Sequence, residues 1–181
     1  MKTLVLIDLI NDMVAESGKL SGKGYLDHAI RRGVPEAVQE WRARSDVDNV
    51  IHVGLEFRQG FTDAPKHSIL LGQVQKFGVA EVGSDGCQFV TWAQPEASDF
   101  VLRKRRMSPF MATELEFLLR ALGTETVLIG GVATDLAVNS AARDAHDRDF
   151  KVGVVEGLCI AATDAEHDAA IENMRKFATI F

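Results

Sequence analysis

The chain has little of what holds small secreted domains or membrane proteins together. Its 181 residues include two cysteines, Cys87 and Cys159, whose spacing gives neither a disulfide framework nor a metal-ligand pattern. No apolar run approaches the roughly 18–20 residues that span a bilayer. The apolar N-terminus is interrupted by Asp8 and Asp12 and no small-residue cleavage site follows. We therefore expect a cytoplasmic protein with reduced thiols, no catalytic metal and no membrane partner.

Positive charge is also scarce. The formal net charge is −6, and the only basic cluster is Arg103–Arg106. Nucleic-acid binding depends on clustered lysine and arginine, so we do not expect that class of partner. Apolar content of 46% and charged content of 25% are those of an ordinary globular domain. A chain of this length can bury its own core, which predicts a single domain over residues 1–181.

Apolar runs alternate with helical patterns along the chain. This order predicts an α/β fold of three layers, with helices on both faces of a mostly parallel sheet. Two pairs, Thr113 with Glu116 and Thr163 with Glu166, predict capping boxes at helix starts. The expected strands are 3–8, 49–57, 99–104, 126–132 and 151–156, with a short one near 178–181, and the expected helices are 25–44 (kinked or divided at Pro35), 113–122, 135–148 and 163–177.

The segment from Arg58 to Gly86 fits neither pattern. It contains five glycines, Pro65 and scattered apolar residues. Long irregular segments inside compact domains often form lids or binding loops. We therefore expect this segment to contribute to a ligand site and to its specificity.

The carboxyl ends of parallel strands are where ligands bind in such sheets. The first strand delivers Asp8 there, the third delivers Lys104, and the fifth delivers Glu156 and then Cys159. A carboxylate that closes an apolar strand is partly desolvated, which raises its pKa and suits it to acid–base chemistry. Each residue also has a structural alternative, since Asp8 can cap a turn and Lys104 can belong to a solvated basic face.

The fourth strand runs through a tight turn into a helix, in the sequence "GGVATDLAVNSAARDA" (130–145). This is how α/β enzymes present backbone N–H groups and a nucleophile at the edge of a sheet. Yet the first helical turn is Leu136, Ala137 and Val138, and none of these side chains can attack a substrate. A reaction at this turn would depend on other residues.

Three blocks together resemble the isochorismatase-like, or cysteine hydrolase, superfamily. They are "LVLIDLINDM", "VLRKRRMSPF" and "VLIGGVATDLAVNSAARDAHDRDFKVGVV", and the resemblance extends over nearly the whole chain. It implies a Rossmann-like, six-stranded parallel sheet flanked by helices. It also implies a homo-oligomer, a dimer or tetramer, whose neighbouring subunit helps to wall the site.

The resemblance assigns roles to individual residues. Asp8 matches the family's acid/base aspartate and Lys104 its catalytic lysine. Val132–Ala133 matches a non-proline cis peptide that shapes the oxyanion pocket. Phe110 matches an aromatic residue near the substrate. No residues match the Asp–His–His metal site of nicotinamidases, so the resemblance implies neither a metal nor another cofactor.

The main departure from the family pattern is Ala137, which occupies the position of the nucleophilic cysteine in the amidohydrolases of this superfamily. Isochorismatases also lack the thiol, because they hydrolyse a vinyl ether by protonating carbon and adding water. The sequence therefore favours a hydrolase of a small molecule that uses Asp8 with Lys104 and no cysteine. Two alternatives stay open: an amide or ureide hydrolase whose cysteine has been replaced by Ala137, naturally or by design, and a catalytically silent small-molecule-binding protein.

Two arginines are candidates for binding a carboxylate on the substrate. Arg58 follows the second strand, and Arg106 follows Lys104. A guanidinium group pairs with a carboxylate through two parallel hydrogen bonds, as a substrate such as isochorismate would require. The identity of the substrate does not follow from the sequence.

Overall fold

The computed structural model describes all residues, 1–181, and contains one six-stranded sheet in the order β3-β2-β1-β4-β5-β6. Every pair of neighbouring strands is parallel, which confirms the predicted fold class. The strands are β1 (Lys2–Ile7), β2 (Asn49–Leu55), β3 (Phe100–Lys104), β4 (Thr126–Val132), β5 (Lys151–Ile160) and β6 (Thr179–Ile180). The helices are α1 (Asn11–Val14), α2 (Tyr25–Arg31), α3 (Val34–Arg42), α4 (Val74–Phe77), α5 (Leu115–Ala121), α6 (Asn139–Asp147) and α7 (Asp164–Met174).

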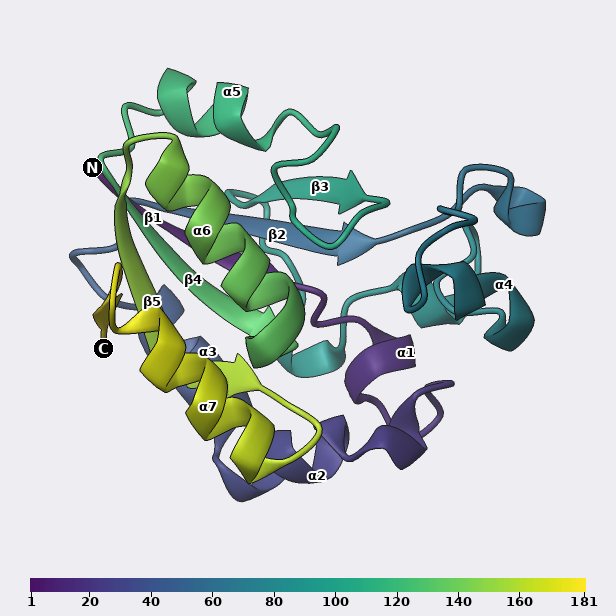
Figure 1. Cartoon of the computed structure of the whole chain (residues 1–181). Coiled ribbons are helices and arrows are strands. Elements are labelled where there is room, and N and C mark those ends of the chain that lie inside the picture. The colour runs from purple at the N-terminus through teal and green to yellow at the C-terminus, as the bar shows by residue number, and fades with distance from the viewer.

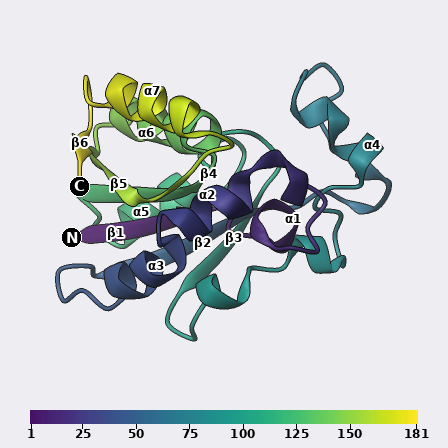
Figure 2. The same ribbon diagram turned by 90° about the horizontal axis from the view of Figure 1, so that it is seen from below.

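The sheet is buried on both faces because its side chains alternate between two cores. Leu4 and Leu6 of β1 pack with the core that includes residues of α2 and α3, whereas Val5 and Ile7 pack with residues of α5, α6 and α7. Figure 2 shows α6 and α7 on one side of the sheet and α2 and α3 on the other. None of the helices has both the length and the apolar character needed to cross a membrane.

The long helix expected from residue 25 to residue 44 is two helices. Gly33 has φ of 65° and separates α2 from α3, and Pro35 lies in the first turn of α3. A proline is tolerated there because the first N–H groups of a helix have no intrahelical acceptor. This is one of the two outcomes that Pro35 predicted.

One of the two predicted capping boxes forms in part. At α7 the Thr163 hydroxyl accepts a hydrogen bond from the Glu166 N–H at 3.2 Å, and the Glu166 carboxylate accepts from this hydroxyl at 3.0 Å rather than from the Thr163 N–H. The prediction for Thr113 is wrong, because this hydroxyl donates to the Pro109 carbonyl and accepts from the Leu115 N–H instead. The Glu116 carboxylate reaches Arg148, so an ion pair between helices replaces the local cap.

The fifth strand is longer than expected, and this changes what lies at its end. β5 continues to Ile160 through an irregularity in its pairing with β4 between Ile129 and Gly131. Glu156 therefore lies inside the strand rather than at its carboxyl end. Its carboxylate contacts Arg32, His167 and Arg175 and takes no part in the site at the carboxyl edge.

The irregular segment between β2 and β3 forms a separate lobe with its own small core. Phe57, Phe61, Val74 and Val79 pack together within this core. Figure 1 shows the lobe, with α4, beyond the carboxyl ends of the strands. The segment thus stands at the edge of the sheet where ligands bind in parallel α/β folds.

Candidate active site

Asp8 is the buried carboxylate at the end of β1. Its φ of 54° lies in the left-handed region, and its side chain is close to fully buried. The backbone N–H of Leu55, at the end of β2, donates to its Oδ1 atom at 2.8 Å. An aspartate tolerates this backbone conformation better than most residues, and such positions concentrate at functional sites.

Lys104, the last residue of β3, meets Asp8 across the sheet edge. Its Nζ atom lies 2.7 Å from Asp8 Oδ2, and only 2% of the residue is exposed. The same ammonium group donates to the carbonyls of Arg106 and Met107, each at 3.0 Å. All three of its protons therefore have acceptors, which holds the charged lysine in one orientation.

Burial raises the pKa of the Asp8 carboxyl above its ordinary value, while the Lys104 charge and the Leu55 N–H oppose the rise. The net effect favours a carboxyl group that can hold a proton closer to neutral pH than a surface aspartate does. Lys104 stabilises the carboxylate that remains once this proton has left. The pair is suited to giving a proton to a bound molecule and taking one back.

Ala137 lies on the opposite wall, in the turn after β4. The peptide between Val132 and Ala133 is cis, and a single π-helical turn, Thr134–Val138, leads into α6. Ala137 is 3% exposed and presents only a methyl group to the cavity. The N–H of Ala133 has no backbone or side-chain acceptor in the protein, so it can donate to a bound oxygen atom.

Neither cysteine substitutes for the missing nucleophile. Cys159 is buried, its thiol donates to the Val155 carbonyl at 3.2 Å, and burial raises its pKa to about 12. Cys87 is buried in the lobe and donates to the Ser84 carbonyl at 3.1 Å. A protonated, buried thiol is unreactive, because the thiolate is the nucleophilic form.

Asp8, Lys104 and Ala137 line a cavity of about 250 Å³ with a largely apolar wall. The irregular segment supplies a third of that wall, as its glycine-rich sequence predicted. The lining residues are Asp8, Met13, Leu20, Lys23, Tyr25, Leu55, Leu70, Leu71, Gln73, Val74, Phe77, Val79, Lys104, Met107, Val132, Ala133, Leu136 and Ala137.

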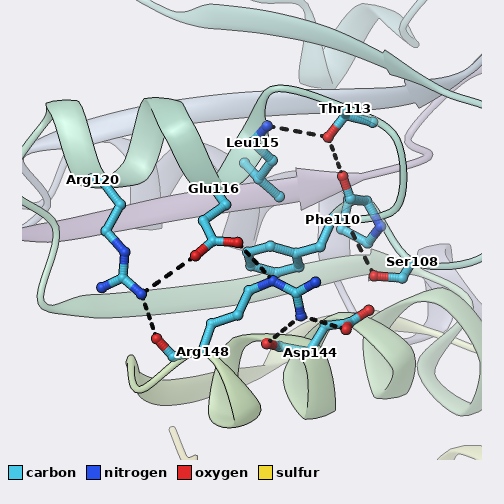
Figure 3. Close-up of polar contacts among 9 residues, drawn as sticks. Ser108, Phe110, Thr113, Leu115, Glu116, Arg120, Asp144 and Arg148 are labelled. Carbon is cyan, nitrogen blue, oxygen red and sulfur yellow. Dashed lines mark hydrogen bonds and ion pairs between the residues drawn. The ribbon is translucent and has the colours of Figure 1, made fainter.

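Three of the predicted substrate-binding residues do not reach this cavity. Phe110 is buried in the core, with the guanidinium of Arg148 over its ring at 5.0 Å (Figure 3). Arg58 is largely exposed and lies 3.9 Å from Asp63. Arg106 donates to the carbonyls of Asp63 and Arg105. Core packing and Asp63 thus engage the side chains of these three residues outside this cavity.

The cluster around Phe110 joins two helices. Arg148 donates to Glu116 of α5 at 2.9 Å and to Asp144 of α6 at 2.5 Å, as Figure 3 shows. Two carboxylates thus hold the guanidinium over the aromatic ring. The arrangement fixes α5 against α6 and covers one face of the buried Phe110 ring.

Asp12 is a functional candidate that the sequence analysis passed over. Its buried carboxylate accepts hydrogen bonds from the N–H of Ala80 at 2.7 Å and of Lys19 at 3.2 Å. The Lys19 ammonium lies 3.7 Å from the same carboxylate and donates to the Gly78 carbonyl. A Cβ at Gly86 would lie 2.1 Å from the Asp12 carboxylate, so only glycine fits there. Asp12 therefore ties α1 to the lobe. In the sequence, only its position four residues after Asp8 could have indicated a role near the site.

The structure contains no group of three or more His, Cys, Asp or Glu side chains in an arrangement that would hold a metal ion. The polar side chains around the cavity are those of Asp8, Lys23, Gln73, Lys104 and Tyr25. These groups suit hydrogen bonding and proton transfer.

A buried Asp–Lys pair at the carboxyl edge of a parallel α/β sheet, facing a largely apolar cavity of small-molecule size, is the architecture of enzymes that act on small molecules. The chain belongs to the isochorismatase family: the isochorismatase domain matches residues 2–181. Members of this family are hydrolases, and so is this protein.

Individual relatives agree with this assignment. The chain is 27% identical over 177 residues to YwoC of Bacillus subtilis, an uncharacterized isochorismatase family protein, covering 93% of this chain and 82% of that one. It is 36% identical over 84 residues to the ureidoacrylate amidohydrolase RutB of Methylorubrum extorquens, covering 46% of this chain and 34% of that one. A match to YecD of Escherichia coli O157:H7, 33% identical over 88 residues, likewise spans about half of each protein, with 46% of this chain and 47% of YecD.

Solved structures share the fold over nearly the whole chain. An isochorismatase family protein from Desulfovibrio vulgaris superimposes with a TM-score of 0.82 at 27% identity, covering 99% of this chain and 92% of that one. The pyrazinamidase/nicotinamidase of Streptococcus mutans superimposes with a TM-score of 0.83 at 24% identity, covering 100% of each chain, which shows the shared fold alone.

Proposed function

We propose that the protein hydrolyses a small molecule without a covalent enzyme intermediate, with Asp8 as general acid and base and Lys104 as its electrostatic partner. The observation that carries this proposal is the intact Asp8–Lys104 pair, at 2.7 Å, on a cavity where Ala137 offers only a methyl group. Covalent catalysis needs an activated nucleophile, and the cavity wall contains no cysteine, serine or threonine.

A vinyl ether is the bond type that this machinery suits. Asp8 transfers its proton to the terminal alkene carbon, which leaves an oxocarbenium ion and the Asp8 carboxylate. Water adds to the cationic carbon and returns a proton to Asp8. The hemiketal then separates into an alcohol and a carbonyl compound. Lys104 stabilises the carboxylate between the two proton transfers, and the apolar wall strengthens that interaction by excluding water.

The turn after β4 is proposed to hold the reacting oxygen. The Ala133 N–H is free and Ala133 lines the cavity together with Val132. A fixed donor stabilises negative charge on oxygen at little reorganisation cost, so in this scheme the Ala133 N–H serves the oxygen that leaves as the hemiketal separates, and not the oxocarbenium ion. Val132 and Ala133 thus act through their backbone rather than through their side chains.

The test is product release from a panel of vinyl ethers, isochorismate included, by the natural chain and by Asp8→Asn. We expect turnover by the natural chain and a loss of about 100-fold or more in the variant, the usual contribution of a positioned acid. The rate should fall as pH rises through the raised pKa of Asp8, because the acid must carry its proton. Equal rates in both chains would exclude Asp8 as the acid.

A second candidate is a C–N hydrolase scaffold that lacks its nucleophile. It is favoured by the position of Ala137, which lies on the cavity wall in the turn that follows the free Ala133 N–H. It also agrees with the similarity to proteins named ureidoacrylate amidohydrolase and nicotinamidase. In this second candidate, Asp8 and Lys104 alone do not hydrolyse an unactivated amide. A thiol at position 137 would have to be restored for the reaction to occur.

Ammonia release from a panel of amides and ureides separates the two candidates. The natural chain, Ala137→Cys and the control Ala137→Ser would be assayed side by side. Ammonia from the cysteine variant alone would favour the C–N hydrolase scaffold and contradict the first proposal. Silence from all three, together with vinyl-ether turnover, supports the first proposal. Silence in both assays would leave a protein that binds its ligand without turning it over.

We also propose a cytoplasmic homo-oligomer, dimer or tetramer. Its support is a set of exposed apolar side chains on the cavity-lining lobe: Ile69, Leu70 and Phe77 are 93%, 48% and 52% exposed. Contiguous exposed apolar surface often marks an interface. Light scattering would give a mass of two or four chains, and Phe77→Glu should reduce it.

A further inference from the structure

Two buried histidines lie behind the turn that follows β4. His28 of α2 and His167 of α7 are fully buried, and the centroids of their rings are 5.1 Å apart. Neither side chain lines the cavity that holds Asp8. Both nitrogens of His28 and Nε2 of His167 have no hydrogen-bond partner, whereas His167 Nδ1 lies 3.1 Å from the Thr134 hydroxyl oxygen. Buried polar groups normally have partners, so the one hydrogen bond of this pair indicates what it serves.

Thr134 connects the histidines to the candidate active site. It follows Ala133 directly, begins the π-helical turn Thr134–Val138 and is fully buried. The Ala133 carbonyl accepts from two N–H groups of the same turn, at 3.0 and 3.1 Å, while the Ala133 N–H stays free and Ala133 lines the cavity. The bond between Thr134 and His167 is the turn's one side-chain hydrogen bond to another element. It therefore ties the free N–H to α7.

His167 is held as a neutral ring by its surroundings. Burial is the main cause that lowers its pKa, Arg32 lowers the pKa further, and nearby carboxylates oppose the shift. Burial also lowers the pKa of His28 to about 4, so this second ring adds no charge near neutral pH. A neutral imidazole has one donor and one acceptor nitrogen. His167 Nδ1 can therefore make one defined hydrogen bond with the Thr134 hydroxyl.

The hydroxyl of Thr134, the imidazole of His167 and the carboxylate of Glu156 stand in the order of a nucleophilic triad, but they do not form one. Glu156 Oε1 lies 3.7 Å from His167 Nε2, which is beyond hydrogen-bond distance. The Thr134 side chain is buried and does not line the cavity. A nucleophile must reach the substrate. Thr134 therefore serves the site through its position and not through its reactivity.

We propose that His167 is a positioning residue, which holds Thr134 and thereby keeps the free Ala133 N–H in place at the cavity. The ring of His28, packed on His167 from α2, fixes the orientation of the imidazole. The catalytic benefit rests on the proposed function, in which this N–H serves the leaving oxygen. A donor stabilises charge on oxygen at little cost only when it is already in position, so loosening the turn weakens that stabilisation.

Kinetics of two Thr134 variants test the proposal. Thr134→Val removes the hydroxyl and Thr134→Ser keeps it. We expect kcat to fall about tenfold in the valine variant with KM changed by less than about twofold, because displacing a donor costs less than removing it outright. Thr134→Ser should restore most of kcat.

The matched control is Thr124→Val. It removes a buried hydroxyl that shares a 2.7 Å hydrogen bond with Thr3 at the amino end of the sheet, away from the turn. Thermal melts should show a similar loss of stability in Thr124→Val and Thr134→Val, because each loses one buried hydrogen bond of the same kind. The kcat of Thr124→Val should stay that of the natural chain, which separates positioning from a general loss of stability.

A second measurement needs no substrate. The Ala133 amide signal in a proton–nitrogen correlation NMR spectrum reports the surroundings of this N–H. We expect the signal to shift in His167→Leu and to stay close to its natural position in His167→Asn, whose amide group can take the place of Nδ1. Both variants remove the aromatic ring, so the difference between them reports the hydrogen bond to Thr134.

An unchanged kcat in Thr134→Val, an equal loss in Thr124→Val, or equal Ala133 shifts in the two His167 variants would overturn the proposal. If the natural chain hydrolyses no vinyl ether while the Ala133 signal moves only in His167→Leu, the proposed reaction is contradicted and the positioning by His167 is supported. Turnover by the natural chain that Thr134→Val leaves unchanged would do the reverse.

Discussion

Two buried acid–base clusters stand at opposite ends of the sheet, and they differ in what remains free. At the carboxyl end, Asp8 accepts from Lys104 and Leu55 and faces the cavity. At the amino end, just before β3, Asp99 Oδ2 lies 2.6 Å from Arg42 and 3.2 Å from His52, and accepts from the Glu96 N–H at 2.8 Å.

The difference teaches which buried charge is available for chemistry. The Asp99 side chain is 5% exposed, and its Oδ2 atom alone receives Arg42 of α3, His52 of β2 and the Glu96 N–H, so it serves to pin α3 and the start of β3 together. The Asp8 carboxylate is equally buried but keeps room for a ligand beside it. Asp99 also lines a cavity, of about 300 Å³, but its wall is mostly polar, whereas Asp8 faces a largely apolar one together with the free Ala133 N–H. Burial, ion pairing and a neighbouring cavity therefore do not mark a catalytic group by themselves; a cavity whose wall suits a small ligand does.

Asp8→Asn is the substitution that should best distinguish the role of the Asp8 cluster from that of the Asp99 cluster. Asparagine keeps the size of the side chain and can still accept from Leu55, but it cannot donate the proton. We expect activity per folded molecule to fall by about 100- to 10,000-fold. The midpoint of thermal unfolding should also fall, because the asparagine NH2 group would face the buried Lys104 ammonium. Rate measurements and thermal melts on the same preparation check both parts, and activity per folded molecule within a factor of two of the unsubstituted chain would refute the contrast.

Asp99→Ala should show the reverse pattern. Removing this carboxylate leaves Arg42 with the exposed Glu96, at 3.0 Å, as its one carboxylate partner beside the Gln94 carbonyl, at 2.8 Å, and leaves His52 without its partner. We expect a loss of about 3 kcal/mol in the free energy of unfolding, measured by urea denaturation. Activity per folded molecule should stay within a factor of two of the natural chain, since the cluster does not line the cavity.

The two clusters should also respond to pH in opposite directions. Burial lowers the pKa of His52 from 6.5 to about 4, so the unfolded chain takes up this proton more readily than the folded one. Stability should therefore be fully present above about pH 6.5 and be lost as pH falls toward about 4. Activity, which needs protonated Asp8, should instead decline as pH rises.

His52→Gln, which can still donate to Asp99, is the variant that checks this assignment. It should flatten the dependence of the unfolding midpoint on pH between 6.5 and 4, without moving the pH profile of activity. An unchanged slope would mean that other groups, such as buried His28, whose pKa is also lowered to about 4 by burial, dominate acid unfolding.

The smallest expected effect comes from Asp12, which serves the cavity indirectly. Asp12→Ala leaves the buried N–H of Ala80 without an acceptor and frees the lobe that carries α4. We expect KM to rise about tenfold, from a loss on the order of 1–2 kcal/mol, with kcat changing less. The control is Asp85→Ala, which removes an exposed contact to Asn11; an equal rise in KM there would contradict a specific role for Asp12.

The sequence by itself determined the layers of the fold and the two charged residues of the site. Alternating apolar runs and helical stripes identified the six strands and most helices, because periodicity follows directly from which face is buried. Asp8 and Lys104 were found because each ends a buried strand, and parallel strands bring their carboxyl ends to one edge.

Only the tertiary structure decided which other residues share the cavity. Phe110, Arg58 and Arg106 lie near Lys104 or at a strand end in sequence, yet packing against Arg148 and contacts with the Asp63 segment direct them elsewhere. Asp12 had no sequence pattern, since its role depends on a contact with a segment more than fifty residues away in the chain. Local sequence determines the element to which a residue belongs, and long-range packing determines which groups its side chain contacts.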